Sequence, residues 1–125
     1  MKEFAAIIAM NKKKYSLSYK FYENAVFGNA GYTPDSPISP FVSTASCMNL
    51  GDIYYSVGEK ERAIDLYGKA AGRESSSYLR SEIFYRIACI YNNYGDVKNA
   101  IRSLDYALTT YPDNARANLL KTKLK

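Results

Sequence analysis

The chain has 125 residues, of which 47% are hydrophobic and 23% charged, and its net charge is +5. This is one domain's length of chain, and its apolar share predicts a packed core rather than disorder. Histidine is absent, so the side chain that most often serves as a general base or a metal ligand is missing. No catalytic set of other residues can be recognised, and we predict a protein that is not an enzyme.

The chain begins with a predicted short helix at residues 3–13, followed by a second helix at residues 15–27. The apolar run at residues 4–10 follows Glu3 and precedes the basic run Lys12–Lys14, which is the reverse of the order in a signal peptide. The run is also too short to span a membrane. We therefore expect a cytoplasmic protein without a membrane span.

Two cysteines, Cys47 and Cys89, lie within helical patterns and do not form a CxxC motif. This spacing argues against a zinc site, a redox motif and a disulfide scaffold. Both are expected to be reduced thiols in or near the core, and no cofactor or metal site is predicted.

Residues 28–39 are rich in Gly, Pro, Asn, Asp and Ser and predict a loop. The loop is either a tolerated surface insertion or a functional insertion on a helical scaffold. Ser39 and Pro40 then have the pattern of an N-cap followed by Pro at the first helical position.

Helical periodicity predicts further helices at residues 40–57, 60–72, 77–94 and 97–110. Gly95 stands where a left-handed C-cap is needed, and Asp96 can N-cap the next helix. A last helix is expected from residue 114 to about residue 123, with Asp113 as its N-cap. The leucines expected to cover the open end of the helical stack are Leu119, Leu120 and Leu124.

The sequence repeats with a constant offset of 37 residues. The offset pairs Cys47 with Phe84, Leu50 with Ile87, Gly51 with Ala88, Tyr54 with Tyr91, Gly58 with Gly95, Ala63 with Ala100, Tyr67 with Leu104 and Ala70 with Ala107. So many matched positions at one offset indicate an internal repeat. Residues 1–27 have the pattern of a third, degenerate copy.

The copy at residues 81–114 resembles the tetratricopeptide repeat (TPR), a helix–turn–helix unit. The family pattern consists of an aromatic residue, Leu-Gly, Tyr, Ala, Phe, Ala and Pro, in this order along the chain. The residues at the corresponding positions here are Phe84, Ile87-Ala88, Tyr91, Ala100, Leu104, Ala107 and Pro112. The preceding copy departs from it at Ser75, which stands in place of the closing Pro. The resemblance implies an all-α fold, an α-α superhelix of about three repeats with a C-terminal capping helix.

The chain is predicted to form a single domain. Its parts are a degenerate first repeat (residues 1–27), a loop insertion (28–39), a second repeat (40–77), a third repeat (78–113) and the capping helix (114–125). The first repeat is either a terminal capping repeat or the edge of a longer repeat array.

The resemblance also implies that the first helix of each repeat lines a concave groove for a peptide or helix of a partner protein. By position, the groove residues are Met48, Asn49, Asp52, Tyr55, Glu82, Tyr85, Arg86, Cys89 and Asn92, with Phe4, Ile7 and Asn11 from the first repeat. Asn49 and Arg86 suit an extended peptide, because amides satisfy backbone groups and a guanidinium pairs with a carboxylate. The alternative is that these are ordinary solvated residues.

TPR chaperone adaptors grip a C-terminal Asp with a clamp of Lys, Asn and Arg side chains. Asn49 and Arg86 match that clamp, but Glu3, Ile7 and Glu82 do not, and Glu82 is expected to repel a carboxylate. We therefore predict a non-catalytic adaptor or scaffold that binds a protein or peptide in another kind of polar and aromatic groove.

Three alternatives remain open. The first is a secretion-type chaperone that shelters an export substrate. The second is self-association into a homo-oligomer through Phe4, Ile7 and Ile8, and the third is polyanion binding through Lys12–Lys14 and Lys20. A run of three lysines at a helix turn is more often a solvated corner, which argues against nucleic acid.

Overall fold

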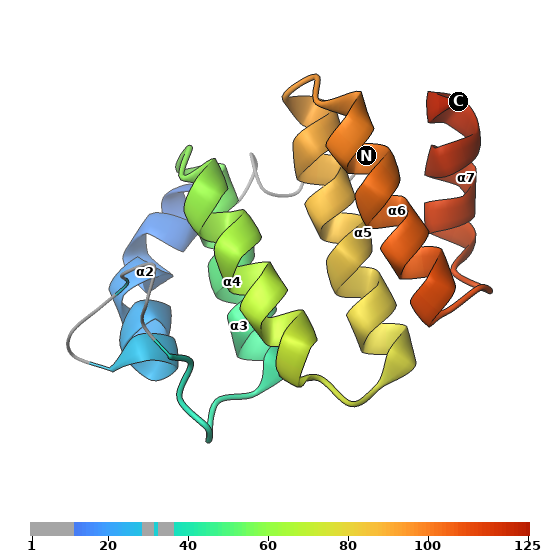
Figure 1. Ribbon diagram of the computed structural model, residues 1–125. Coiled ribbons are helices and arrows are strands. Elements are labelled where there is room, and N and C mark those ends of the chain that lie inside the picture. The colour runs from blue at the N-terminus through green and yellow to red at the C-terminus, as the bar shows by residue number, and fades with distance from the viewer. Residues whose placement is uncertain (1–11, 29–31, 33–36) are drawn as a thin grey trace. The chain divides into compact units, whose positions relative to one another are not determined.

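The computed structural model describes residues 12–28, 32 and 37–125, with side chains from Lys20 onward (Figure 1). Phe4, Ile7, Ile8 and Asn11, and most of the helix expected at residues 3–13, lie outside the described residues. The elements in order are α2 (Lys12–Phe27), α3 (Thr44–Ser56), α4 (Lys60–Arg73), α5 (Ser77–Asn93), α6 (Val97–Thr110) and α7 (Ala115–Leu124). This part of the chain contains helices and no strand, which confirms the predicted all-α class.

The chain divides into two compact units, Met1–Ala70 and Ala71–Lys125. In the first unit α2 packs against α3, and α3 meets α4 where Gly51 lies against the ring of Tyr67. The Tyr67 ring is fully buried, and its hydroxyl donates a hydrogen bond to Asp52. Tyr54, also fully buried, donates to Glu23 Oε2 of α2 at 2.7 Å. The tyrosines at repeated positions therefore build the core while their hydroxyls keep polar partners.

Helix α3 begins at Thr44, so the expectation that it begins at residue 40 was wrong. Its N-cap is Ser43, whose hydroxyl accepts from the backbone N–H of Ser46 at 3.1 Å. Ser39 instead accepts from the N–H of Phe41 at 3.4 Å, which belongs to a local turn. Two serines could each cap the helix, and the cap is formed by the later one.

The loop predicted at residues 28–39 is anchored to the first unit by Tyr32. The Tyr32 hydroxyl donates to Asp65 Oδ2 of α4 at 2.9 Å. Its ring meets Phe27 and Tyr54 edge-on, with centroids 5.5 and 5.8 Å apart, and the Arg62 guanidinium lies 4.9 Å from its centroid. These contacts connect the insertion to three helices and favour a structural role for this tyrosine.

In the second unit α6 packs against both α5 and α7, as Figure 1 shows. Gly95 has φ +80° and Asp96 accepts from the N–H of Asn99 at 3.1 Å, so the predicted turn between α5 and α6 is confirmed. Ala88 and Ala100 are fully buried on the inner faces of these two helices. Small residues at these positions allow the helices to approach closely.

Helix α7 begins at Ala115 and is capped by Asn114 rather than by the predicted Asp113. The Asn114 side chain accepts from the N–H of Ala117 at 3.0 Å and is itself buried. Of the leucines expected to cover the stack, Leu120 is buried, whereas Leu119 is 58% exposed. The helix therefore covers the core with one edge and leaves an apolar residue in solvent.

Candidate partner-binding site

The predicted groove residues of the second repeat lie on α3, in the first unit. Asn49 is exposed and Tyr55 is half-buried, so both are accessible to a partner. Met48 is buried, and Asp52 accepts the hydrogen bond from Tyr67. Of the four positions on this helix, two are accessible to solvent and two contribute mainly to the packing of the repeat.

The predicted residues of the third repeat lie on α5, in the second unit. Tyr85 is 5% exposed and Cys89 is fully buried, whereas Arg86 and Asn92 are half-buried. Both cysteines of the chain are buried thiols outside any disulfide, as the sequence predicts. Arg86 and Asn92 therefore offer the accessible polar groups of this helix.

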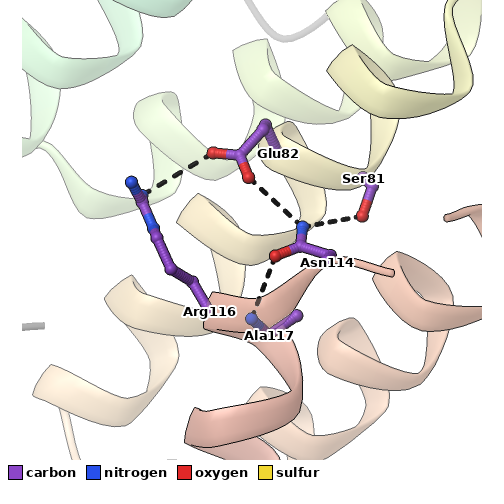
Figure 2. A network of polar contacts seen from close by, with 5 residues as sticks. All are labelled: Ser81, Glu82, Asn114, Arg116 and Ala117. Atoms are coloured by element: carbon purple, nitrogen blue, oxygen red, sulfur yellow. Dashed lines mark hydrogen bonds and ion pairs between the residues drawn. The ribbon is translucent and has the colours of Figure 1, made fainter. Parts of the chain in front are cut away.

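Glu82, the remaining predicted residue of α5, belongs to a polar network that ties α5 to α7 (Figure 2). Asn114 Nδ2 donates to Ser81 Oγ at 2.8 Å and to Glu82 Oε1 at 3.3 Å, while Asn114 Oδ1 accepts from the N–H of Ala117. Arg116 Nη2 lies 3.6 Å from Glu82 Oε2. The positive guanidinium of Arg116 compensates the Glu82 charge, so the expected repulsion of carboxylates by Glu82 is weakened.

Comparison of the sequence with models of protein families establishes the family of this chain. A family model of the tetratricopeptide repeat matches residues 44–76 and 81–114, which together make up more than half of the chain. The chain belongs to the tetratricopeptide repeat family. Both matches fall on the predicted second and third TPR units, and membership indicates a role in protein–protein interaction.

A solved structure supports the same TPR-like fold. The chain is similar to the type III secretion chaperone SycD of Yersinia enterocolitica, whose structure was solved in complex with a peptide of the translocator YopD. The match has a TM-score of 0.62 at 14% sequence identity and covers 98% of this chain and 85% of SycD. At this identity the similarity shows the fold alone. No curated protein matches the sequence.

Two residues of the TPR capping helix, Asn114 and Arg116, were missed by the sequence reasoning. The family pattern directs attention to the first helix of each repeat, whereas Asn114 is the last residue of the second family match and Arg116 lies beyond it. Asn114 carries a local signal, because Asn is among the preferred N-cap residues. Arg116 carries none, since its contacts with α5 join residues far apart in the chain.

The ring of Tyr85 lies beneath Arg116, whose guanidinium carbon is 4.7 Å from the ring centroid. Burial raises the pKa of Tyr85 from 10.0 to about 12, Cys89 adds to the rise, and Arg116 opposes it. Burial also raises the pKa of the Cys89 thiol. A hydrogen bond from Tyr85 and the positive charges of Arg116 and Arg86 oppose this rise. The thiol is thus kept protonated and is not an activated nucleophile.

Among the described residues, no three potential ligands gather as a metal site would require. The helices described are also too short or too polar to cross a membrane.

The raised pKa of Tyr85 predicts a loss of stability in alkali. The phenol ionises near pH 10 in the unfolded chain but only near pH 12 in the folded one, so the folded state holds its proton more tightly. The stabilisation is complete below pH 10 and is lost as pH rises toward 12. Urea unfolding across this range should show a steeper decline for the wild type than for Tyr85→Phe.

The matched control for this alkaline profile is Tyr94→Phe, which changes an exposed tyrosine at the end of α5. It should decline as steeply as the wild type. Equal slopes for the wild type and Tyr85→Phe would contradict the prediction.

Proposed function

We propose that this TPR protein is a non-catalytic adaptor that binds an extended peptide or a helix of a partner protein through the first helix of each repeat. The observation that carries the proposal is the pair of TPR matches, of which the first covers α3 and the second covers most of α5. Both helices keep accessible polar or aromatic side chains although most of their surface is buried.

On each helix the accessible side chains have the chemistry of peptide recognition. Asn49 and Asn92 offer amides that can both donate to and accept from a peptide backbone. Arg86 offers planar donors for carbonyl or carboxylate oxygens. Tyr55 adds aromatic area with few rotatable bonds to immobilise, which suits an interface anchor.

A second candidate function is that of a chaperone for an export substrate, and the similarity to SycD, solved with a translocator peptide, favours it. The two functions differ in what happens to the client protein. An adaptor joins partners that are stable by themselves, whereas a chaperone keeps soluble a client that aggregates alone. Co-expression of a captured client with and without this protein separates them by the soluble fraction of the client.

The test of the proposed function is capture of partners from the native extract on the immobilised full chain. The variant Asn49→Ala/Tyr55→Ala/Arg86→Ala, verified to keep the wild-type melting temperature, is compared with the wild type. We expect the variant to lose at least one polypeptide that the wild type retains. Each truncated contact is worth about 1–2 kcal/mol at an interface, so the combined loss should exceed tenfold in affinity.

A matched control changes three exposed residues on the second helices of the repeats, Glu61→Ala/Lys98→Ala/Arg102→Ala. This variant should retain the wild-type set of polypeptides. The proposal fails if both triple variants capture the same set as the wild type.

A further inference from the structure

The segment between α2 and α3 carries three of the chain's four prolines, Pro34, Pro37 and Pro40, at every third position. A polyproline II helix has about three residues per turn, so this spacing places the prolines on one side of such a helix. Each proline fixes its own φ at about −65° and favours an extended conformation in the residue before it. Pro34 lies outside the described residues, whereas Pro37 and Pro40 lie within them.

The exposure of residues 37–40 follows the same period of three. Pro37 and Pro40 are exposed, whereas Ile38 and Ser39 between them are half-buried. Residues 37–40 belong to neither a helix nor a strand. The two pyrrolidine rings are therefore presented to solvent by an irregular segment whose other two side chains are partly covered.

Backbone hydrogen bonds fix this segment on the first unit. The N–H of Ser39 donates to the carbonyl of Val26 in α2 at 2.8 Å, and the N–H of Val42 donates to the carbonyl of Ser39 at 3.3 Å. The second bond closes a turn with Pro40 and Phe41 at its central positions, and proline is favoured at the first of these. A segment that is already fixed loses little conformational entropy when it binds.

The turn presents one more apolar side chain next to the prolines. Phe41 is 96% exposed, so its ring is available to a partner over nearly its whole surface. An aromatic ring contributes a large apolar contact area with few rotatable bonds. Pro37, Pro40 and Phe41 together form an exposed apolar surface on a short, anchored segment.

We propose that residues 37–41 are a docking segment, recognised by a partner protein that has a groove lined with aromatic side chains. Such grooves bind proline-rich segments because polyproline II is preformed and presents its rings at the period that the groove accepts. A membrane surface or a single apolar pocket would use Phe41 and would not depend on the prolines. The segment shares no residue with the surface proposed on α3 and α5, so the inference goes beyond the proposed function.

The probe for the test is a panel of purified SH3 and WW domains, whose grooves are of this aromatic kind. Binding of each labelled domain to the full chain is measured by fluorescence anisotropy. We expect at least one domain to bind the wild type, and Pro37→Ala/Pro40→Ala to weaken that binding about tenfold or more, because two ring contacts are lost. Both prolines are exposed, so this variant should keep the wild-type melting temperature.

The matched control is Pro112→Ala, which removes an exposed proline outside the segment and should leave the affinity unchanged. Equal effects of this control and of Pro37→Ala/Pro40→Ala would overturn the proposal, and so would a panel in which no domain binds. Phe41→Ala should weaken binding less than the double proline change. Loss of binding in Phe41→Ala alone would show a pocket for one aromatic ring instead of a polyproline II groove, which also contradicts the proposal.

A last comparison separates this surface from the one on α3 and α5. Asn49→Ala/Tyr55→Ala/Arg86→Ala leaves residues 37–41 unchanged, so it should bind the domain as tightly as the wild type does. If this variant loses the domain while Pro37→Ala/Pro40→Ala retains it, the contact belongs to the helices and the docking segment is refuted. Failure of the docking segment leaves the proposed function standing, since that function is tested with captured polypeptides.

Discussion

Replacement of Asn114 by Ala is expected to lower the free energy of unfolding by about 2–4 kcal/mol. Loss of an N-cap costs about 1 kcal/mol, and each buried hydrogen bond that is removed costs about another 1 kcal/mol. Asn114 caps α7 through Ala117 and also donates to Ser81 Oγ and Glu82 Oε1. Since the residue is buried, water cannot replace these partners without rearrangement.

The two roles of Asn114 can be separated by a second variant. Asn114→Ser keeps a cap acceptor but is too short to reach α5, so it should lose about half as much stability as Asn114→Ala. The control Asn118→Ala removes an exposed side chain of the same helix, which donates to the carbonyl of Pro112 at 3.1 Å, and should cost less than about 0.5 kcal/mol.

Urea unfolding followed by far-UV circular dichroism measures all three Asn variants. A loss for Asn114→Ala no larger than that for Asn118→Ala would show that α7 is held mainly by Leu120 and its apolar neighbours.

The helices could be predicted from the sequence wherever a local signal had only one interpretation. Helical spacing and the Gly95-Asp96 turn predicted α5 and α6 closely, and the repeat offset connected them to α3 and α4. The beginning of α3 and the cap of α7 were misplaced because two residues within a few positions of each other could each act as the N-cap. Ser39 and Ser43 are both residues that can act as an N-cap, and the helix begins after Ser43.

The candidate site could be predicted only in outline. Position in the repeat assigned the candidate residues to α3 and α5, but it could not distinguish half-buried Arg86 from buried Tyr85, because burial depends on what covers the helix. The contribution of α7 was beyond local reasoning, since Asn114 meets Ser81 across 33 residues of sequence. Glu82 is an example. From the sequence alone we expect its negative charge to repel carboxylates, but Arg116 lies beside it in the structure and weakens that repulsion.

Gly51→Ala is expected to destabilise the first unit by about 1–2 kcal/mol. A Cβ at this position would lie 2.6 Å from Cε1 of Tyr67, far inside ordinary contact distance. The Tyr67 ring cannot easily retreat, because it is fully buried and its hydroxyl is bonded to Asp52. Overpacking of this kind costs about 1–3 kcal/mol, which exceeds the gain of up to about 1 kcal/mol from replacing a helical Gly.

The matched control is Gly68→Ala on α4, where an added Cβ would meet nothing within 4 Å. Only the helix-propensity gain applies there, so this variant should be more stable by up to about 1 kcal/mol. Opposite signs for the two Gly→Ala changes in urea unfolding are the expected result. A stabilising effect of Gly51→Ala equal to that of Gly68→Ala would show that the Tyr67 ring is free to move.

The third repeat explains why the second needs a glycine at this position. Gly51 corresponds to Ala88 and Tyr67 to Leu104 at the same offset, so the larger side chain is matched with the smaller partner in each repeat. Gly51→Ala/Tyr67→Leu should therefore be less destabilised than the sum of the two single changes, by about 1 kcal/mol. Strict additivity in this double-mutant cycle would show that the two positions do not share one packing constraint.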